Sequence, residues 1–163
     1  DIDVSKNIKL KNINIINPGN DGIDFMESSA TVSNLSVIGS KDKGISVGEK
    51  SSVNIKDSSF DKNFIGIAVK DNSTVKIEKS YFFNNYYQMA SYSKNWRYSR
   101  GGDIKIYNSK FKTKINRFTV MSEPGSEKND QDIKLKQDSS ILIMDSDISG
   151  DIIKKGKKIS IKY

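Results

Sequence analysis

Acidic and basic side chains recur along this chain at a spacing of 22 residues. Glu27, Glu49 and Asp71 follow one another at this spacing, and Lys43 lies 22 residues after Asp21. If the chain repeats with the same period, such residues stack at about 4.8 Å, the distance between neighbouring strands. Stacked carboxylates repel each other unless cations, protons or solvent compensate their charge. The spacing therefore predicts a cluster of interacting charged groups that is suited to acid–base chemistry or cation binding.

Two chemistries fit this cluster. In the first, paired carboxylates hydrolyse a glycosidic bond as acid and as base or nucleophile. In the second, carboxylates hold Ca²⁺, the one cofactor considered, against an acidic sugar while Lys43 or Lys70 removes the proton next to its carboxyl group. The candidate catalytic residues are Asp21, Asp24, Lys43, Glu49 and Lys70. The candidate metal ligands are Glu27, Glu49 and Asp71. The alternative is that these are solvated turn residues without a catalytic role.

A second group combines aromatic and basic side chains between positions 92 and 100. The only tryptophan of the chain lies here among tyrosines, a lysine and two arginines. Aromatic faces beside guanidinium groups suit sugar rings with acidic substituents, through stacking and charge-assisted hydrogen bonds. The candidate substrate-binding residues are Tyr92, Lys94, Trp96, Arg97, Tyr98 and Arg100. The alternative is that these side chains pack a loop against the flank of the fold.

The repeat that would position these groups is visible in the glycines. Gly22, Gly44 and Gly66 open the phrases Gly-Ile-Asp-Phe, Gly-Ile-Ser-Val and Gly-Ile-Ala-Val, and Gln88 opens a fourth copy. A second phrase alternates apolar and polar residues, with β-branched residues in many apolar positions, as strands prefer. Its six copies begin at Ile8, Ala30, Val53, Val75, Ile104 and Ile141. A fixed period of this size indicates a solenoid, in which each repeat buries its apolar face against its neighbours.

We therefore predict an all-β fold, a parallel β-helix of about six rungs with about three short strands in each. The phrase, with an Asn-Ser or Asp-Ser corner before a large apolar residue, resembles the right-handed parallel β-helix of pectate lyases, polygalacturonases and related carbohydrate-active proteins. The resemblance covers residues 8–111 well and 133–163 less well. It implies the fold more strongly than the activity, since lyases, hydrolases, epimerases, phage tailspikes and surface stalks share this fold.

Composition restricts the chemistry further. The chain has no cysteine and no histidine, which excludes disulfides, thiolate nucleophiles, Ser-His-Asp catalysis and histidine-bound metals. The stretch from Asn20 to Asp24 resembles one polygalacturonase motif, but the other motifs of that family are missing. The net charge of +7 suits an acidic partner, although lysines on every rung also serve as a solvated coat. There is no nucleic-acid recognition motif and no apolar run long enough to span a membrane.

Two insertions interrupt the period. Ile106 follows Ile77 by 29 residues, and Ile143 follows Ile106 by 37, which places insertions near residues 92–102 and 113–132. We predict a single β-helix domain over residues 1–163. Because no capping helix is evident at the N-terminus, we expect it to belong to a larger protein whose neighbouring domains are possible partners.

These observations favour a polysaccharide-binding or polysaccharide-processing domain of a bacterial surface or secreted protein, with an acidic polysaccharide as the partner. Any catalysis would be lyase-like or epimerase-like. The alternative is a structural stalk, an adhesin or an accessory docking module without catalysis. Either function places the protein outside the cell or at the cell surface.

Overall fold

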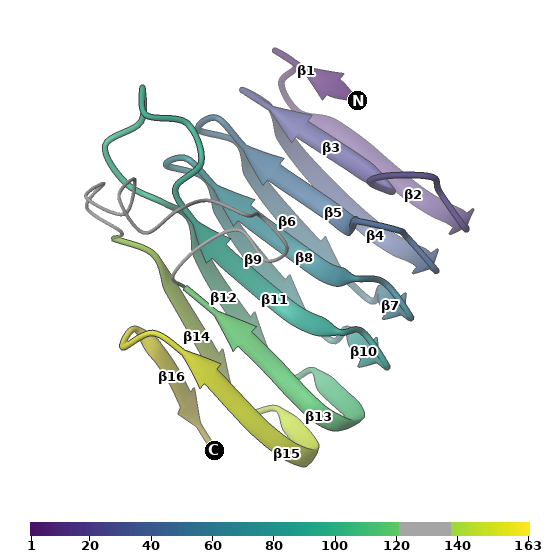
Figure 1. The fold of residues 1–163 in the computed structure, drawn as a ribbon. Coiled ribbons are helices and arrows are strands. Elements are labelled where there is room, and N and C mark those ends of the chain that lie inside the picture. The colour runs from purple at the N-terminus through teal and green to yellow at the C-terminus, as the bar shows by residue number, and fades with distance from the viewer. Residues whose placement is uncertain (121–137) are drawn as a thin grey trace.

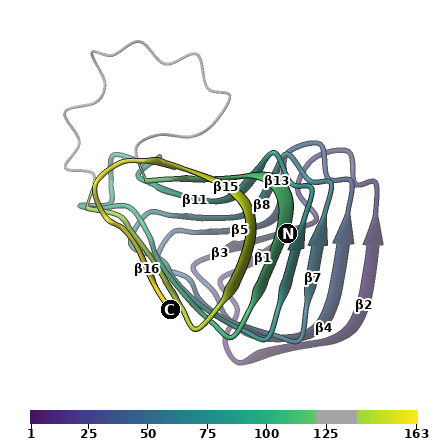
Figure 2. The same ribbon diagram turned by 90° about the horizontal axis from the view of Figure 1, so that it is seen from below.

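The computed structural model describes residues 1–120 and 138–163, and these residues form strands and turns without helices. Every strand pair is parallel, and the pairs join into one 16-stranded sheet that winds around an apolar interior (Figure 1). Seen from below, the strands of successive rungs lie over one another (Figure 2). This is the parallel β-helix that the repeat predicts. Within these two ranges, no helix is long and apolar enough to cross a membrane.

The strands form three ladders, A, B and C, which run along the stack. Ladder A contains β1 (Ile2–Asp3), β3 (Ile23–Met26), β5 (Lys43–Gly48), β8 (Ile65–Lys70) and β11 (Tyr87–Tyr92). Ladder B contains β2 (Ile8–Ile16), β4 (Ser29–Ile38), β6 (Ser52–Lys56), β9 (Thr74–Glu78), β12 (Asp103–Tyr107), β14 (Ser140–Met144) and β16 (Ile159–Lys162). Ladder C contains β7 (Ser59–Asp61) and β10 (Tyr81–Phe83).

Long strands connect these ladders. The first half of β4 pairs with β6 and its last three residues pair with β7. In the same way β13 (Lys110–Thr119) pairs first with β10 and then with β11, and β15 (Asp147–Lys155) pairs along β13. Each of these strands turns a corner of the helix, so the three ladders are one continuous sheet.

The predicted register is confirmed. The six phrase copies lie in the ladder B strands β2, β4, β6, β9, β12 and β14, and Val75 pairs with Val53 below and Ile104 above. One further strand, β16, pairs with β14, so the lysine-rich C-terminal stretch continues the ladder. The loop of residues 93–102 joins β11 to β12 (Figure 1).

The second predicted insertion needs a correction at its start. Residues 113–119 are not a loop but the second half of β13, where Phe118 pairs with Met89 of the rung below. The expectation was wrong because the lysines and the arginine in this segment hide the inward-facing pattern. Residues 121–132 of the expected insertion lie outside the described residues.

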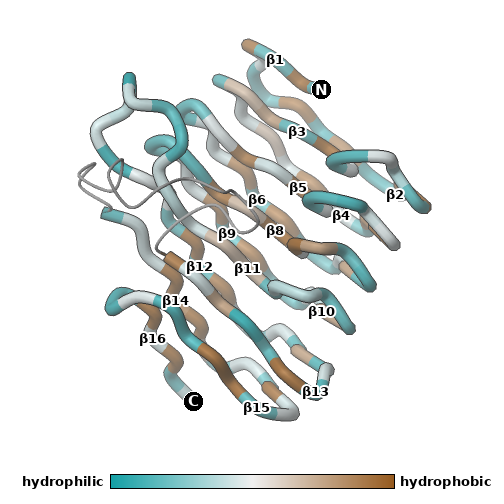
Figure 3. Tube along the Cα trace, viewed as in Figure 1, coloured by the Kyte–Doolittle hydropathy of each residue, from teal (hydrophilic) through white to brown (hydrophobic). Residues whose placement is uncertain are grey.

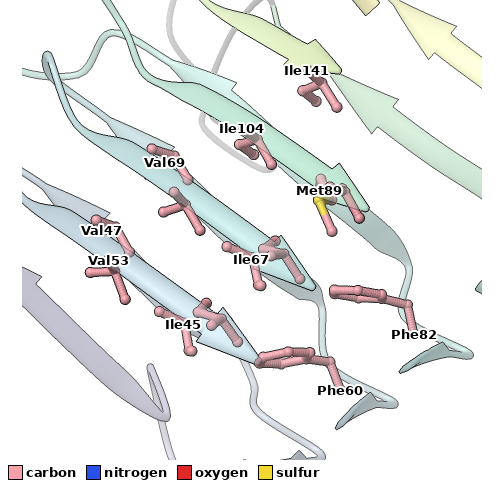
Figure 4. Close-up of a cluster of buried hydrophobic side chains, with 14 of the residues drawn as sticks. Ile45, Val47, Val53, Phe60, Ile67, Val69, Phe82, Met89, Ile104 and Ile141 are labelled. Atoms are coloured by element: carbon pink, nitrogen blue, oxygen red, sulfur yellow. The ribbon is translucent and has the colours of Figure 1, made fainter. Parts of the chain in front are cut away.

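Like residues stack in the core. The columns of Ile23, Ile45, Ile67 and Met89 and of Phe60, Phe82 and Phe111 are buried, and Figure 4 shows members of both. The phenyl rings are 5.1 Å and 4.9 Å apart between centroids and nearly parallel. Apolar residues concentrate along the strands and hydrophilic residues in the turns (Figure 3). The aliphatic and aromatic columns thus supply the apolar burial that holds the rungs together.

The repeated glycine is required by close approach of the backbone. A Cβ at Gly44 would lie 2.6 Å from the carbonyl oxygen of Gly66, and a Cβ at Gly66 would lie 2.6 Å from that of Gln88. Such distances force the neighbouring backbone to move, so any side chain here disturbs the stack.

Serines at the corners of the rungs form hydrogen bonds with the backbone. The Ser80 hydroxyl accepts the backbone N–H of Ser58 at 3.3 Å and donates to the Glu78 carbonyl at 2.9 Å. Ser109 repeats this one rung higher, accepting the N–H of Ser80 at 3.1 Å. Lys79, the residue before Ser80, has a positive φ of 48°, which turns the chain at this corner. The turn leaves the backbone N–H of Ser80 without a strand partner. The hydroxyls therefore satisfy buried backbone groups and are not nucleophiles.

We expect Phe82→Ala to lower the free energy of unfolding by about 3–5 kcal/mol, because it removes the middle ring of a buried stack and leaves a cavity. Urea denaturation followed by circular dichroism measures this change. The neighbouring variant Tyr81→Ala is the control, since Tyr81 is 42% exposed, and it should cost less than about 1 kcal/mol. Equal losses for the two variants would contradict the assignment of Phe82 to the core.

Candidate functional site

The outer face of ladder A carries most of the candidate catalytic residues. Register stacks Asp24 of β3 under Ser46 of β5, then Ala68 of β8 and Ala90 of β11. On the same face Met26 pairs with Gly48, Lys70 lies against Gly48, and Tyr92 pairs with Lys70. Apart from Lys70, the face therefore changes from polar at Asp24 and Ser46 to apolar at Ala68, Ala90 and Tyr92.

Lys43 lies at the centre of the polar part. Its side chain is only 3% exposed, and its Nζ lies 3.8 Å from Asp21 Oδ1 and forms a close ion pair with Asp42. The backbone N–H of Lys43 also donates to Asp21 Oδ1 at 3.1 Å. Stacking thus brings Asp21 and Lys43 together as their spacing predicts. Asp42, which the 22-residue period places one rung above Asn20, is not among the candidate catalytic residues but joins them through its ion pair with Lys43.

Lys70 reaches over the same face from β8. A Cβ at Gly48 would lie 3.1 Å from Lys70 Cε, so the absence of a side chain at Gly48 makes room for the lysine. Lys70 is buried, and this burial lowers the pKa of its ammonium group. The charge of Asp24 opposes the shift, whereas the charges of Lys94 and Lys43 add to it.

Two acceptor atoms in this cluster have no partner. Asp24 Oδ1 and Ser46 Oγ are buried and make no hydrogen bond within the described part of the chain. Burial also raises the pKa of the Asp21 carboxyl, although Lys43 acts in the opposite direction through its charge and its N–H. Four of the five candidate catalytic residues therefore form one cluster, in which two lysines and two carboxylates are held away from bulk solvent. Such environments are common at sites of proton transfer, and also occur in structural ion-pair networks.

The fifth candidate, Glu49, belongs to the predicted acidic column. Glu27, Glu49 and Asp71 occupy equivalent turns after the ladder A strands, with φ of 47°, 56° and 53°. Burial, together with the charges of these three carboxylates, raises the pKa of the Tyr98 hydroxyl, so the column and the loop lie close together. The Tyr98 hydroxyl lies 3.5 Å from Glu27 Oε1, as a donor to it.

The three carboxylates of the column do not converge on one metal position. Among residues 1–120 and 138–163, no group of three acidic side chains is arranged to hold a metal ion. Stacking spreads the carboxylates along the helix axis instead of converging them on one point. In addition, Asp71 Oδ1 accepts the backbone N–H groups of Lys94 and Asn95 at 2.8 Å and 2.9 Å. These three carboxylates are therefore not gathered as ligands of one ion in this geometry, and Ca²⁺ binding by Glu27, Glu49 and Asp71 stays a prediction.

The aromatic group divides into buried and exposed members. Tyr92 is fully buried with Ile65, Ala68 and Ala90 on the outer face of ladder A, so its ring offers no stacking surface for a ligand. Its register position above Lys70 places it there, so this candidate substrate-binding residue packs within the fold.

Arg100 has protein partners. It forms an ion pair with Asp103, and its Nε donates to the Asp138 carbonyl at 3.2 Å. Its guanidinium group therefore joins the loop to the ladder B strands. The two contacts of Lys94 and Tyr98 with the acidic column likewise fix the loop backbone.

Trp96 and Arg97 remain at the tip of the loop. Trp96 is 75% exposed, and the Arg97 guanidinium carbon lies 5.8 Å from the centre of its ring. The backbone N–H of Arg97 donates to the Asn95 side chain at 3.1 Å, which shapes the turn. Of the six candidate substrate-binding residues, these two present an aromatic face and a guanidinium group to solvent.

The comparisons with known proteins agree with the fold. The family model described as right-handed beta helix region matches residues 1–120 of the chain. No curated protein and no solved structure matches the chain.

We expect Asp71→Ala to release the loop, because it removes the acceptor of two loop N–H groups. Hydrogen bonds to a charged acceptor contribute about 1.5–3 kcal/mol, so hydrogen exchange at the Lys94 and Asn95 amides should accelerate about 10- to 100-fold. Amide exchange measured by NMR tests this. Asp71→Asn keeps the Oδ1 acceptor and should retain most of the protection. Unchanged exchange in Asp71→Ala would show that Asp71 does not anchor the loop.

The lowered pKa of Lys70 gives a second test. The Lys70 amine binds a proton more readily in the unfolded chain than in the folded chain. The contribution of Lys70 to the free energy of unfolding therefore increases as pH rises from its folded pKa to its ordinary pKa. Asp24→Asn removes a charge that favours the ammonium form, so the pKa of Lys70 should fall further. NMR titration of the lysine side chains measures the pKa of Lys70 in the wild type and in the Asp24→Asn variant. Lys76 is the control, because it is exposed and its pKa, which Glu78 raises, should be the same in both proteins. An unchanged or raised pKa of Lys70 in the Asp24→Asn variant would contradict the electrostatic interaction between Asp24 and Lys70.

Proposed function

The chain belongs to the right-handed β-helix family, and we propose that this domain binds an anionic polysaccharide at the tip of the loop of residues 93–102. The observation that carries the proposal is the pair of Trp96 and Arg97. A large aromatic ring is three-quarters exposed and has a guanidinium group 5.8 Å from its centre. Exposure of such an apolar ring to water is unfavourable. A ligand that covers the ring removes this surface from water and gains binding free energy.

The chemistry of the pair selects the ligand. The apolar face of a sugar ring stacks on an indole, and a guanidinium group binds a carboxylate through two parallel hydrogen bonds. Within the described residues, Arg97 has no carboxylate partner, whereas Arg100 in the same loop pairs with Asp103. A sugar that carries a carboxylate satisfies both groups at once. The net charge of +7 favours the approach of such a polymer at low ionic strength.

The anchored loop supports specific binding. Asp71 accepts hydrogen bonds from two backbone N–H groups near the start of the loop. The Tyr98 hydroxyl lies 3.5 Å from Glu27 Oε1, and Lys50 Nζ lies 5.7 Å from the centre of the Tyr98 ring. A backbone held at both ends loses less conformational freedom when a ligand binds.

From the proposed ligand we also propose a location. The domain would work outside the cell or at a bacterial cell surface, where it would meet anionic polysaccharides.

A second candidate function is proton abstraction from an acidic sugar, favoured by the buried cluster on ladder A. A lowered pKa leaves more of a lysine in its neutral, basic form at a given pH, so Lys70 is the candidate general base. Asp24, with its unpartnered oxygen, would orient the lysine or the substrate. Lyase-like or epimerase-like chemistry then requires the substrate to reach Lys70, which is 8% exposed. The rival without catalysis is a stalk, an adhesin or an accessory module that docks to another domain.

Binding is tested first on an array of uronate-containing, sulfated and neutral glycans, and then by calorimetry with trigalacturonate as the acidic probe. Trp96→Ala should weaken binding of trigalacturonate about tenfold, because stacking and its desolvation contribute roughly 1–1.5 kcal/mol. Arg97→Ala should weaken it at least as much, and the wild-type affinity should fall as salt is raised.

Two matched variants separate ring and charge from general damage. Trp96→Phe keeps an aromatic face and should bind more tightly than Trp96→Ala, and Arg97→Lys keeps the charge but loses the paired hydrogen bonds. Cellotriose, a neutral probe, should not bind. If no glycan on the array binds, the proposal fails and the stalk or docking module takes its place. If Trp96→Ala and Arg97→Ala bind as the wild type does, the loop is not the binding site.

A further inference from the structure

Three aromatic rings gather at the other end of the ladder A strands, where the chain enters β8 and β11. The ring of Phe64 lies parallel to that of Tyr86, with centroids 5.5 Å apart and planes inclined by 11°. Tyr87 meets both rings edge-on, at 6.0 Å from Phe64 and 5.2 Å from Tyr86. We refer to Phe64, Tyr86 and Tyr87 as the aromatic corner.

The register of the strands builds this corner. Ile65 pairs with Tyr87, so the preceding residues Phe64 and Tyr86 lie one above the other at the spacing of adjacent rungs. Phe64 and Tyr87 also pack against the buried apolar cluster of Ile65, Ala68, Ala90 and Tyr92. Packing therefore accounts for Phe64 and Tyr87, and it holds the ring of Tyr86 in place from below.

Packing does not account for the upper side of the corner. Tyr86 is 52% exposed, and the guanidinium carbon of Arg117, from the next rung, lies 4.5 Å from the centre of its ring. The guanidinium Nη1 makes one long contact, as donor to the Tyr86 carbonyl at 3.5 Å. No carboxylate among the residues that the structure describes pairs with Arg117. An aromatic face and an unpaired cation thus lie together at the surface, as they do at Trp96 and Arg97.

We propose that Tyr86 and Arg117, supported by Phe64 and Tyr87, form a second subsite for an acidic sugar. The tyrosine ring would stack on the sugar, and Arg117, half-buried and already placed beside the ring, would bind the carboxylate. The identity of the ligand class rests on the proposed function, but the site shares no residue with the Trp96 loop.

The two subsites lie at opposite ends of one strand. Tyr86 immediately precedes β11 (Tyr87–Tyr92), whereas Trp96 follows its end by four residues. A strand of this length spans about 20 Å. A long oligosaccharide therefore has two places to bind on this rung, and a short one occupies either of them. Multiple subsites on one polymer raise its overall affinity above that of a short fragment.

The test uses hexagalacturonate and trigalacturonate as probes, with two independent measurements. Calorimetry reports binding at all sites, and the fluorescence of Trp96, the only tryptophan, reports the loop alone. Tyr86→Ala and Arg117→Ala should each weaken hexagalacturonate binding about three- to tenfold while leaving the trigalacturonate-induced change in Trp96 fluorescence unaltered. In the Trp96→Ala variant, Tyr86→Ala should remove the residual binding of hexagalacturonate.

Tyr86→Phe keeps the ring and should bind within about twofold of the wild type, because only the hydroxyl is lost. Arg117→Lys keeps the charge and should bind less tightly than the wild type. Thermal denaturation of each variant shows whether the fold is retained, as the exposure of Tyr86 leads us to expect.

The outcomes separate this inference from the proposed function. If Trp96 fluorescence responds to trigalacturonate but Tyr86→Ala and Arg117→Ala leave hexagalacturonate binding unchanged, the second subsite is wrong and the loop site stands. If Trp96→Ala has no effect while Tyr86→Ala and Arg117→Ala abolish binding, the aromatic corner stands and the loop site is wrong. If folded wild-type protein binds neither acidic probe, both are wrong.

Discussion

In-register stacking of successive rungs is the constraint on which the rest of this structure depends. Each backbone N–H and C=O of a strand must find its partner in the rung above or below, at about 4.8 Å, so each side chain lies on its counterpart from the next rung. A position is therefore occupied by residue types that pack on or bond to their own kind. Phenylalanines stack ring on ring, serine hydroxyls bond to the next corner, and glycines stay where a Cβ would strike the neighbouring carbonyl.

Charged residues cannot obey this rule in the same way, because identical charges at the inter-strand distance repel. On the buried outer face of ladder A opposite charges meet, since Asp21 lies beside Lys43 and the charge of Asp24 acts on Lys70. Where like charges do stack, as at Glu27, Glu49 and Asp71, they lie in turns, and the loop supplies donors to Glu27 and Asp71. The lysine–carboxylate cluster thus forms where the sequence departs from strict repetition.

The two aromatic–arginine pairs arise from the same principle. The scaffold places Tyr86 on Phe64 by register, and it holds the Trp96 loop through Asp71. Arg97 and Arg117 then lie beside exposed rings without a carboxylate partner among the described residues, while Arg100 has one. Rigid stacked rungs with differing loops and corners are an effective way to vary the surface without changing the core.

The sequence by itself determined the rungs, their register, the core columns and the serine corners, because a 22-residue period and strand alternation are properties of the chain that stacking preserves. The same period also brought Asp21 to Lys43. Only the tertiary structure decided that Tyr92 is buried while Trp96 is exposed, that the acidic column anchors a loop instead of converging on a metal, and that Arg117 lies over Tyr86. Those outcomes depend on the path of an insertion and on side-chain directions at turns, which follow no repeat and are set by packing between distant segments.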